Sequence, residues 1–262
     1  MKLLTVKGLV IRTVDIREAD RMVTIFTEEM GVVSALARGA RSLKSRQLSA
    51  TMQFCYGSYV LVKRGEYYWV REAELIESFF DIRHTIEGLA LASYLCEVLS
   101  YVTVAEGDRE LLRLSLNSLY AIASGRHELR KIKAAFEVRA AAVLGFMPDV
   151  IGCAVCGDRR GDFMLDVMDG SLTCLKCRDT LTAAVRLPEE DITRERRIVS
   201  LLSDGAKCAF EYCVYCPPEK IFSFTLPDED MHLFSKGAET YLIHHLERSF
   251  KTLDFYHQMQ GE

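Results

Sequence analysis

The stretch YGSYVLVKRGEYYWVREAEL, residues 56–75, decides the fold of the N-terminal part of this chain. Apolar and polar residues alternate over Tyr56–Lys63 and again over Tyr67–Glu74, and this period of two predicts a pair of β-strands. Residues 64–66, Arg-Gly-Glu, separate the two runs and have the composition of a tight turn. We therefore expect a β-hairpin that ends near residue 75.

Three more strands are predicted upstream of this hairpin. Apolar and polar positions mix at a period near two over residues 3–14, and residues 20–31 and 32–40 are predicted as strands joined by a tight turn at Gly31. A longer connection then separates the third strand from the fourth. Five strands in about 75 residues with this spacing are typical of an OB-fold barrel, and the alternative is another small barrel or a meander.

Beyond residue 80 the apolar residues recur at helical spacing. Three helices, separated by glycines, are predicted between residues 81 and 150. The helical pattern resumes at residues 194–203 and continues in a long C-terminal run that includes Leu242 and Leu253. The fold class is therefore α+β, with an N-terminal five-stranded OB-fold barrel followed by an α-helical domain.

Four cysteines between the helical blocks follow the spacing C-x2-C-x17-C-x2-C. Two intervening residues allow both thiolates of a pair to bind one metal ion, and a hairpin between the pairs, turning at Asp169 and Gly170, would bring them together. Four thiolates leave no open position for water or substrate, so we expect a structural Zn²⁺ site rather than a redox pair or metal-free thiols. The predicted ligands are Cys153, Cys156, Cys174 and Cys177.

A third pair, Cys213 and Cys216 in CVYCPPE, complicates the choice of ligands. A zinc deaminase would need P-C-x-x-C with H-x-E upstream, but here the prolines follow the pair and no H-x-E precedes it. The pair could exchange with the other four cysteines or form a disulfide, and the plainer interpretation is two half-buried thiols. Phosphate-loop and nucleophile-elbow motifs are also absent from the sequence, so we expect no enzymatic activity.

Positive charge is concentrated at the N-terminal end of an acidic chain. The formal net charge is -4, yet residues 1–80 carry 12 Lys and Arg residues against 9 Asp and Glu residues, a net of +3, which leaves -7 for the remainder. The stretch RSLKSRQ, residues 41–47, contains three cations and no acid. A polyanionic ligand would therefore meet the N-terminal part first.

The cations and the hairpin aromatics together predict a groove for single-stranded nucleic acid, in which Lys and Arg neutralise the backbone and aromatic rings stack on bases. Alternation places Tyr67, Trp69 and Arg71 on one face, although the opposite register would turn Tyr68 and Val70 outward. The alternative is a solvated loop beside aromatics that fill the barrel. The predicted contacts are Arg38, Arg41, Lys44, Arg46, Lys63, Arg64, Trp69 and Arg71.

Six segments taken together resemble the RecO family of bacterial DNA repair and recombination mediators in the RecF pathway, and they run in order across nearly the full length. They are VKGLVIRT, ADRMVTIFTEEMGVVSALARGARSLKSR, YWVREAELIESF, FEVRAAAVLGFMPDVIGCAVCG, LTCLKC and HHLERSFKTLDFYHQM. The resemblance implies an OB-fold domain, a helical domain and a zinc-ribbon-like insert. It also implies binding of single- and double-stranded DNA, strand annealing, and contact with RecR and the acidic C-terminal tail of single-strand-binding protein, which together promote RecA loading.

Three domains are expected on this basis. They are an OB-fold nucleic-acid-binding domain at 1–80, a helical domain at 81–150 and 179–262, and a four-cysteine zinc-binding insert at 151–178. We expect the acidic tail to bind cations around an aromatic residue on the third helix, unless these cations form a solvated face. The candidate partner residues are Arg130, Lys133, Phe136 and Arg139.

The N-terminal residues do not have the pattern of a secretion signal, because Lys7 and Arg12 interrupt the apolar run, and no stretch is long and apolar enough for a membrane span. We therefore expect a cytoplasmic, nucleoid-associated protein. The alternative function is a zinc-ribbon adaptor of the transcription type without annealing activity. Its interaction surface would be made by Arg159, Arg160, Lys176 and Arg178.

Overall fold

The computed structural model describes residues 3–65, 67–102, 107–184 and 197–261. The chain forms two compact units, one made of residues 1–129 and 250–262 and the other of residues 130–249. In the described ranges, no helix combines the length and the apolar character that crossing a membrane requires. The predicted boundaries of the three domains stay predictions.

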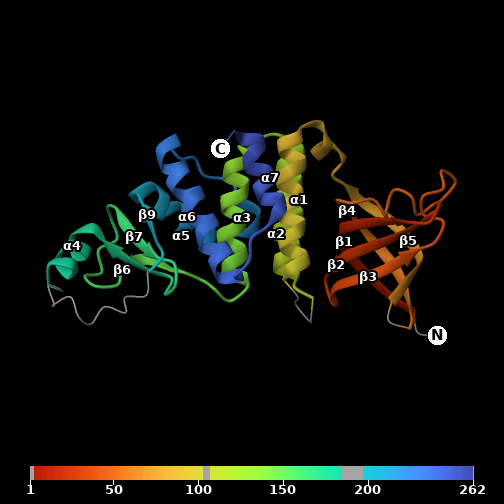
Figure 1. Ribbon diagram of the computed structural model, residues 1–262, viewed down its shortest axis with the longest axis horizontal. Coiled ribbons are helices and arrows are strands. Elements are labelled where there is room, and N and C mark those ends of the chain that lie inside the picture. The colour runs from red at the N-terminus through yellow and green to blue at the C-terminus, as the bar shows by residue number, and fades with distance from the viewer. Residues whose placement is uncertain (1–2, 66, 103–106, 185–196, 262) are drawn as a thin grey trace. The chain divides into compact units, whose positions relative to one another are not determined.

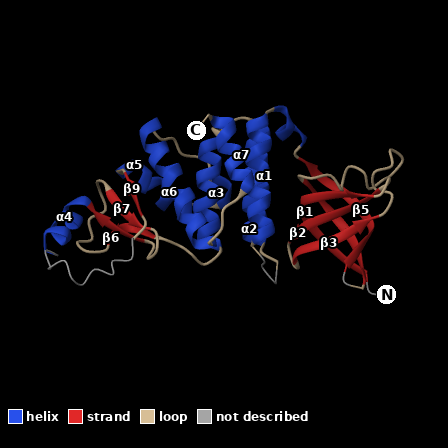
Figure 2. Ribbon diagram, in the orientation of Figure 1, coloured by secondary structure: helices blue, strands red, loops and turns tan. Residues whose placement is uncertain are grey.

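The first unit begins with a closed five-stranded barrel (Figure 2). The strands follow one another around the barrel in the order β1-β2-β3-β5-β4, and β4 pairs back onto β1. All neighbouring strands are antiparallel except β3 and β5, which pair in parallel. This arrangement confirms the predicted OB fold. The strands are β1 (Leu3–Ile16), β2 (Asp20–Thr27), β3 (Gly31–Ala37), β4 (Cys55–Arg64) and β5 (Tyr67–Ser78).

The barrel core is made by the inward-facing residues of the alternating pattern. Val10, Ile25 and Leu61 are completely buried in it, and Val70 is nearly so. The hydroxyl of Tyr59, also in this core, donates a hydrogen bond of 2.7 Å to the backbone oxygen of Ala50. The long connection between β3 and β4 is thereby attached to the barrel interior.

Three helices and a short 3-10 helix complete the first unit. They are η1 (Phe80–His84), α1 (Ile86–Tyr101), α2 (Arg109–Ser124) and α7 (Lys251–Gln260). Thr85 and Asp108 cap the N-termini of α1 and α2 by accepting hydrogen bonds from backbone N–H groups, as their residue types favour. Helix α7 packs alongside α1 (Figure 1), where the rings of Tyr94 and Phe250 meet edge to face with centroids 5.7 Å apart.

The second unit combines helices with a four-stranded sheet in the order β6-β8-β7-β9. Strands β7 and β8 form the predicted hairpin between the cysteine pairs, and Gly170 in its turn has a φ of 65°. The helices are α3 (Leu129–Val143), whose first residue belongs to the first unit, α4 (Leu175–Ala184), α5 (Asp204–Tyr215), η2 (Pro218–Lys220) and α6 (Asp228–Leu246). The strands are β6 (Asp149–Cys153), β7 (Phe163–Asp166), β8 (Ser171–Cys174) and β9 (Val199–Leu202).

Two sequence predictions are wrong in this region. The helix predicted at 194–203 is instead strand β9 over Val199–Leu202, which pairs with β7, and residues 194–196 lie outside the described ranges. Burial alternates along this strand, as a period of two requires. The long C-terminal run is two helices, α6 and α7, because Glu247 adopts a left-handed conformation with a φ of 50° and ends α6.

Candidate nucleic-acid interface and metal centre

The connection between β3 and β4, residues 38–54, carries most of the predicted DNA contacts and is held by hydrogen bonds to the barrel. Near its start, the backbone N–H of Gly39 donates to the carboxylate of Asp20 at 2.9 Å. In its middle, the side-chain amide of Gln47 donates to the backbone oxygen of Arg71 on β5 at 3.0 Å. The connection therefore presents its cations from a defined backbone.

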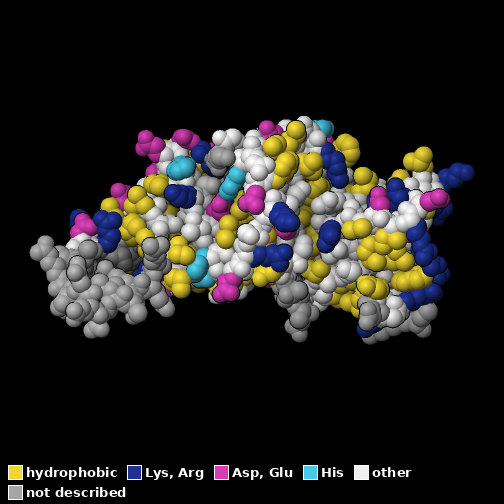
Figure 3. Space-filling model, in the orientation of Figure 1, with side chains coloured by type: hydrophobic (Ala, Val, Ile, Leu, Met, Phe, Trp, Pro, Cys, Tyr) yellow, Lys and Arg dark blue, Asp and Glu magenta, His cyan; other side chains and the backbone are white. Residues whose placement is uncertain are grey.

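The cations of this part of the chain lie in a region without acidic residues. Residues 31–65 contain six Lys and Arg residues and no Asp or Glu residue. All six side chains are exposed, as is Arg71 on β5. Figure 3 shows Lys and Arg side chains gathered at the end of the barrel where the connection lies, with few Asp or Glu side chains among them. An exposed, concentrated positive charge is the electrostatic footprint of a polyanion site.

Arg41 differs from the other cations because its guanidinium group is already engaged in contacts within the protein. Its guanidinium lies 3.2 Å from the carboxylate of Asp15 and donates to the backbone oxygens of Arg17 and Glu18, each at 3.1 Å. Arg21 donates to the same carboxylate, and this hydrogen bond lowers the pKa of Asp15 below its usual value. Arg41 therefore holds the connection in place, and its charge is largely compensated.

The remaining cations keep their charge uncompensated. In the ranges that the structure describes, none of them forms an ion pair with a carboxylate. The folded protein therefore keeps a concentration of uncompensated positive charge on this surface, to which the paired Arg41 contributes little. The uncompensated cations are Arg38, Lys44, Arg46, Lys63, Arg64 and Arg71.

Trp69 lies on the outer face of β5 together with Tyr67 and Arg71, as one of the two predicted registers requires. Val70 points into the core instead. The guanidinium carbons of Arg38 and Arg64 lie 4.0 Å and 4.4 Å from the centroid of the Trp69 ring. Arg38 directly follows β3 and Arg64 ends β4, and these are the two strands on either side of β5, so the Trp69 ring is already in contact with two cations. The ring therefore positions two exposed cations on this face of the barrel.

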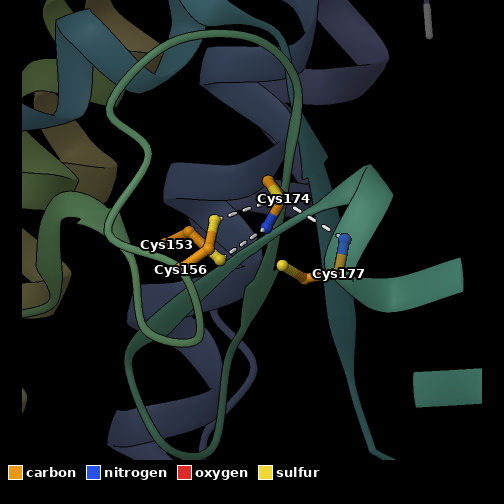
Figure 4. Close-up of side chains that lie close together, drawn as sticks. All are labelled: Cys153, Cys156, Cys174 and Cys177. Atoms are coloured by element: carbon orange, nitrogen blue, oxygen red, sulfur yellow. Dashed lines mark hydrogen bonds between the residues drawn. The ribbon is translucent and has the colours of Figure 1, made fainter. Parts of the chain in front are cut away.

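The four predicted metal ligands converge at one point (Figure 4). Their sulfur atoms all lie within 4.8 Å of one another, and the Sγ atoms of Cys156 and Cys174 are 3.8 Å apart. Cys153 and Cys174 end β6 and β8, Cys156 lies in the turn after β6, and Cys177 lies in the first turn of α4. Sulfurs bound about 2.3 Å from one tetrahedral zinc ion would be about 3.8 Å apart, so the donor set fits such an ion.

The close packing of the four thiols shifts the pKa values of Cys153 and Cys177 in opposite directions. Burial alone would raise the pKa of Cys153, but backbone N–H groups, including that of Cys174 at 3.3 Å, lower it to about 6. Hydrogen bonds with the thiols of Cys156 and Cys174 raise the pKa of Cys177 to about 12. Four negative sulfurs this close repel one another, and a divalent cation removes that repulsion. The cluster could therefore hold a metal ion.

Comparisons with known proteins show the family of the chain. Residues 1–79 match the family model described as Recombination protein O N terminal, and residues 83–204 match Recombination protein O C terminal. The DNA repair protein RecO of Acetivibrio thermocellus is 32% identical over 257 residues, which cover 97% of this chain and 96% of that protein. The chain belongs to the RecO family.

Further RecO relatives match along the whole length. The DNA repair protein RecO of Caldanaerobacter subterraneus subsp. tengcongensis is 28% identical over 256 residues, covering 97% of this chain and 98% of its own. That of Thermoanaerobacter sp. is 26% identical over 262 residues, covering 100% of both chains. The RecO N-terminal match ends one residue after β5, and the C-terminal match contains all four clustered cysteines.

Cys213 and Cys216 are not part of the metal cluster of this RecO chain. In the described residues, the four-sulfur group contains neither of them, and they lie instead at the C-terminal end of α5. Both thiols are buried, and burial raises the pKa of each. The guanidinium of Arg139 donates to the backbone oxygens of both residues and lies 3.4 Å from the Sγ of Cys216. Cys213 and Cys216 therefore lie at the packed C-terminal end of α5, where the buried guanidinium group of Arg139 caps the helix.

The structure contradicts the predicted partner surface on α3. Lys133 is 1% exposed and lies between Glu137 and Glu239, with nitrogen–oxygen distances of 3.0 and 2.5 Å. Phe136 is fully buried, and Arg139 is used at the end of α5. Arg130 pairs with the carboxylate of Asp228. Cations on a helix are usually solvated, and these are buried or paired because, apart from Glu137 on α3 itself, their acidic and carbonyl partners come from helices far along the chain.

Proposed function

We propose that the protein is a DNA-binding recombination mediator in DNA repair. It binds single- and double-stranded DNA on the barrel and anneals complementary strands. The observation that carries this proposal is the group of exposed cations around β5 and the β3–β4 connection, which has no acidic residue among residues 31–65. The names of the relatives, DNA repair protein RecO, support the same role.

Annealing requires only that two phosphate chains approach each other. Lys44, Arg46 and Lys63 neutralise phosphates of the first strand, which lowers its repulsion for a second strand. Arg38 and Arg64 offer planar groups to the bases while Trp69 holds them in position. No covalent step is needed, so the protein acts as a mediator and not as an enzyme.

The partners follow from the family. With RecR and with single-strand-binding protein, whose acidic C-terminal tail it contacts, the protein promotes the loading of RecA onto DNA. We infer that this tail contacts residues other than Lys133 and Arg139, because both of these are engaged inside the second unit. The cluster of four cysteines holds a structural Zn²⁺ ion. The protein works in the cytoplasm on nucleoid DNA.

The salt dependence of DNA binding tests the proposal. The variant Lys44→Ala/Arg46→Ala/Lys63→Ala removes three exposed cations and leaves Arg41, which the structure needs, unchanged. Fluorescence anisotropy with a labelled single strand, measured from low to moderate salt, should show weaker binding and a salt slope lower by about 2. Binding to unrelated sequences should weaken equally, because phosphate contacts carry no sequence information.

A matched control uses two exposed cations beside the metal cluster. Arg159→Ala/Lys176→Ala should leave the affinity and the salt slope unchanged. If instead this control weakens binding and the barrel variant does not, the protein is a zinc-ribbon adaptor. The wild-type protein should also anneal complementary oligonucleotides, both alone and with strands coated by single-strand-binding protein. A protein that neither binds DNA at low salt nor anneals strands would overturn the proposed function.

A further inference from the structure

Leu43 is the most exposed large apolar side chain among the described residues whose exposure is known. It is 93% exposed, whereas Tyr120 follows at 61%. A single exposed leucine is common on protein surfaces, so exposure by itself assigns no role. The position of Leu43, and what surrounds it, distinguish this residue from the others.

The backbone around Leu43 is fixed on both sides by short-range hydrogen bonds. The N–H of Ser42 donates to the oxygen of Gly39 at 3.1 Å, and the N–H of Ser45 donates to the oxygen of Ser42 at 2.8 Å. Two residues before Leu43, Arg41 is bound to Asp15. Consecutive turns therefore hold the leucine side chain outward, away from any apolar surface of the protein.

Uncompensated cations follow this leucine closely. Lys44 and Arg46 lie within three residues of it, whereas Arg41, two residues before it, is paired with Asp15. The nearest acidic residues in the sequence are Glu29 and Glu66. A ligand that is complementary to this surface must carry negative charges at its edge and have an apolar gap between these charges, into which the leucine side chain fits. DNA has this chemistry, because phosphates border a stack of base faces. Proteins that bend or open DNA insert leucine and similar side chains between adjacent bases in this way.

We propose that Leu43 is a wedge that enters between two adjacent stacked bases of bound DNA. The proposal rests on the proposed function and adds a specific role for the β3–β4 connection. Lys44 and Arg46 hold phosphates beside the opened step, and the leucine replaces part of the lost stacking with apolar contact. Bases that are separated in this way are exposed to a complementary strand.

The fluorescence of paired 2-aminopurines tests this directly, because the signal rises when the two bases come apart. One arm uses a duplex and the other a single strand, each with two adjacent 2-aminopurines and saturating protein. The wild-type protein should raise the fluorescence in at least one arm, which identifies the form of DNA that is opened. Leu43→Ala should abolish the rise and weaken binding by about tenfold or more, as expected for the loss of a buried leucine side chain.

The variants separate a wedge from a general loss of binding. Leu43→Phe should restore the rise, and Ile76→Ala, which truncates another exposed side chain of the barrel, should leave it unchanged. Leu43→Ala should keep the wild-type salt slope, because an apolar contact releases no counterions. Because the side chain of Leu43 is exposed, the melting temperature of the Leu43→Ala variant should equal that of the wild-type protein.

The outcomes distinguish this proposal from the proposed function. If the wild-type protein binds DNA without raising the fluorescence, or if Leu43→Ala raises it as the wild type does, the wedge is overturned and DNA binding stands. If the wild-type protein binds no DNA at low salt, both are overturned. If Leu43→Ala leaves DNA binding and the fluorescence rise intact but abolishes contact with a protein partner, Leu43 recognises a peptide and the wedge proposal is wrong.

Discussion

The guanidinium of Arg38 lies 4.0 Å from the centroid of the Trp69 ring, and Trp69 is the only tryptophan of the chain. The residue that organises two cations of the candidate DNA surface is therefore also a fluorescent reporter of that surface. A cation beside an indole ring is stabilised by the ring's negative face, by about 0.5–1 kcal/mol at exposed sites. This contact orders the Arg38 side chain in the free protein.

The first prediction concerns Trp69. Its emission should change when single-stranded DNA is added, and the midpoint of this change should match the anisotropy titration. Trp69→Ala should lower the affinity roughly threefold to tenfold, because Arg38 and Arg64 lose the ring that positions them, yet the salt slope should persist because both charges remain. Trp69→Phe should recover most of the affinity. An emission spectrum that saturating DNA does not alter would place the site elsewhere.

The second prediction concerns the metal. The purified protein should contain one zinc ion per chain, and X-ray absorption should show four sulfur ligands. Cys174→Ser should release the metal and lower the first melting transition by about 5 °C or more, because metal binding supplies much of the folding energy of so short a segment. Cys208→Ser, which changes an exposed cysteine outside the cluster, should do neither. Metal content that survives Cys174→Ser would exclude this set of ligands.

The third prediction concerns Lys133. Lys133→Met leaves the carboxylates of Glu137 and Glu239 without their buried cation and should lower the free energy of unfolding by about 3–5 kcal/mol. Urea denaturation followed by far-UV circular dichroism measures this loss. Lys207→Met is the matched control, because Lys207 is equally buried but its partner Glu211 is 41% exposed and can be solvated. Equal losses in the two variants would mean that Lys133, Glu137 and Glu239 together contribute no more to stability than the pair of Lys207 and Glu211.

The fourth prediction concerns pH. Burial lowers the pKa of His245, whose ring stacks on Phe146 at 4.9 Å. A depressed pKa in the folded protein means that the unfolded chain binds the proton more readily, so stability is lost as the pH falls through 6.5, the usual value, toward the folded value. His245→Phe should flatten this loss in thermal melts between about pH 7 and 5. His232→Phe, at an exposed position, should retain it.

The sequence predicted the barrel well because its strands obey a period of two over seven or more residues. The sequence also predicted the metal cluster, because two CxxC pairs at this spacing are a specific signal for metal binding. Strand β9 was missed because its four apolar-rich residues, 199–202, are too few to distinguish a strand from a helix. Its assignment depends on pairing with β7, about 35 residues earlier in the chain.

Long-range partners also decide the surroundings of several cations. The spacing of residues 41–47 shows a basic loop, but not that Asp15 binds Arg41, which then anchors the connection between β3 and β4. Likewise, nothing local to α3 indicates that Glu239 and the end of α5 take up Lys133 and Arg139. The pairing of Arg38 and Arg64 with one indole ring also requires three strands to be placed side by side.

Helix α7 is separated from its neighbour α1 by about 150 residues of intervening chain, which include the whole second unit. During synthesis, the ribosome therefore makes the partner of α1 long after α1 itself has emerged. Until then, the surface that receives Phe250 and hydrogen-bonds to Thr252 through Glu97 is open to chaperones and to aggregation. A premature stop before residue 250 would thus damage the unit that was translated first, although every residue of the barrel would be present.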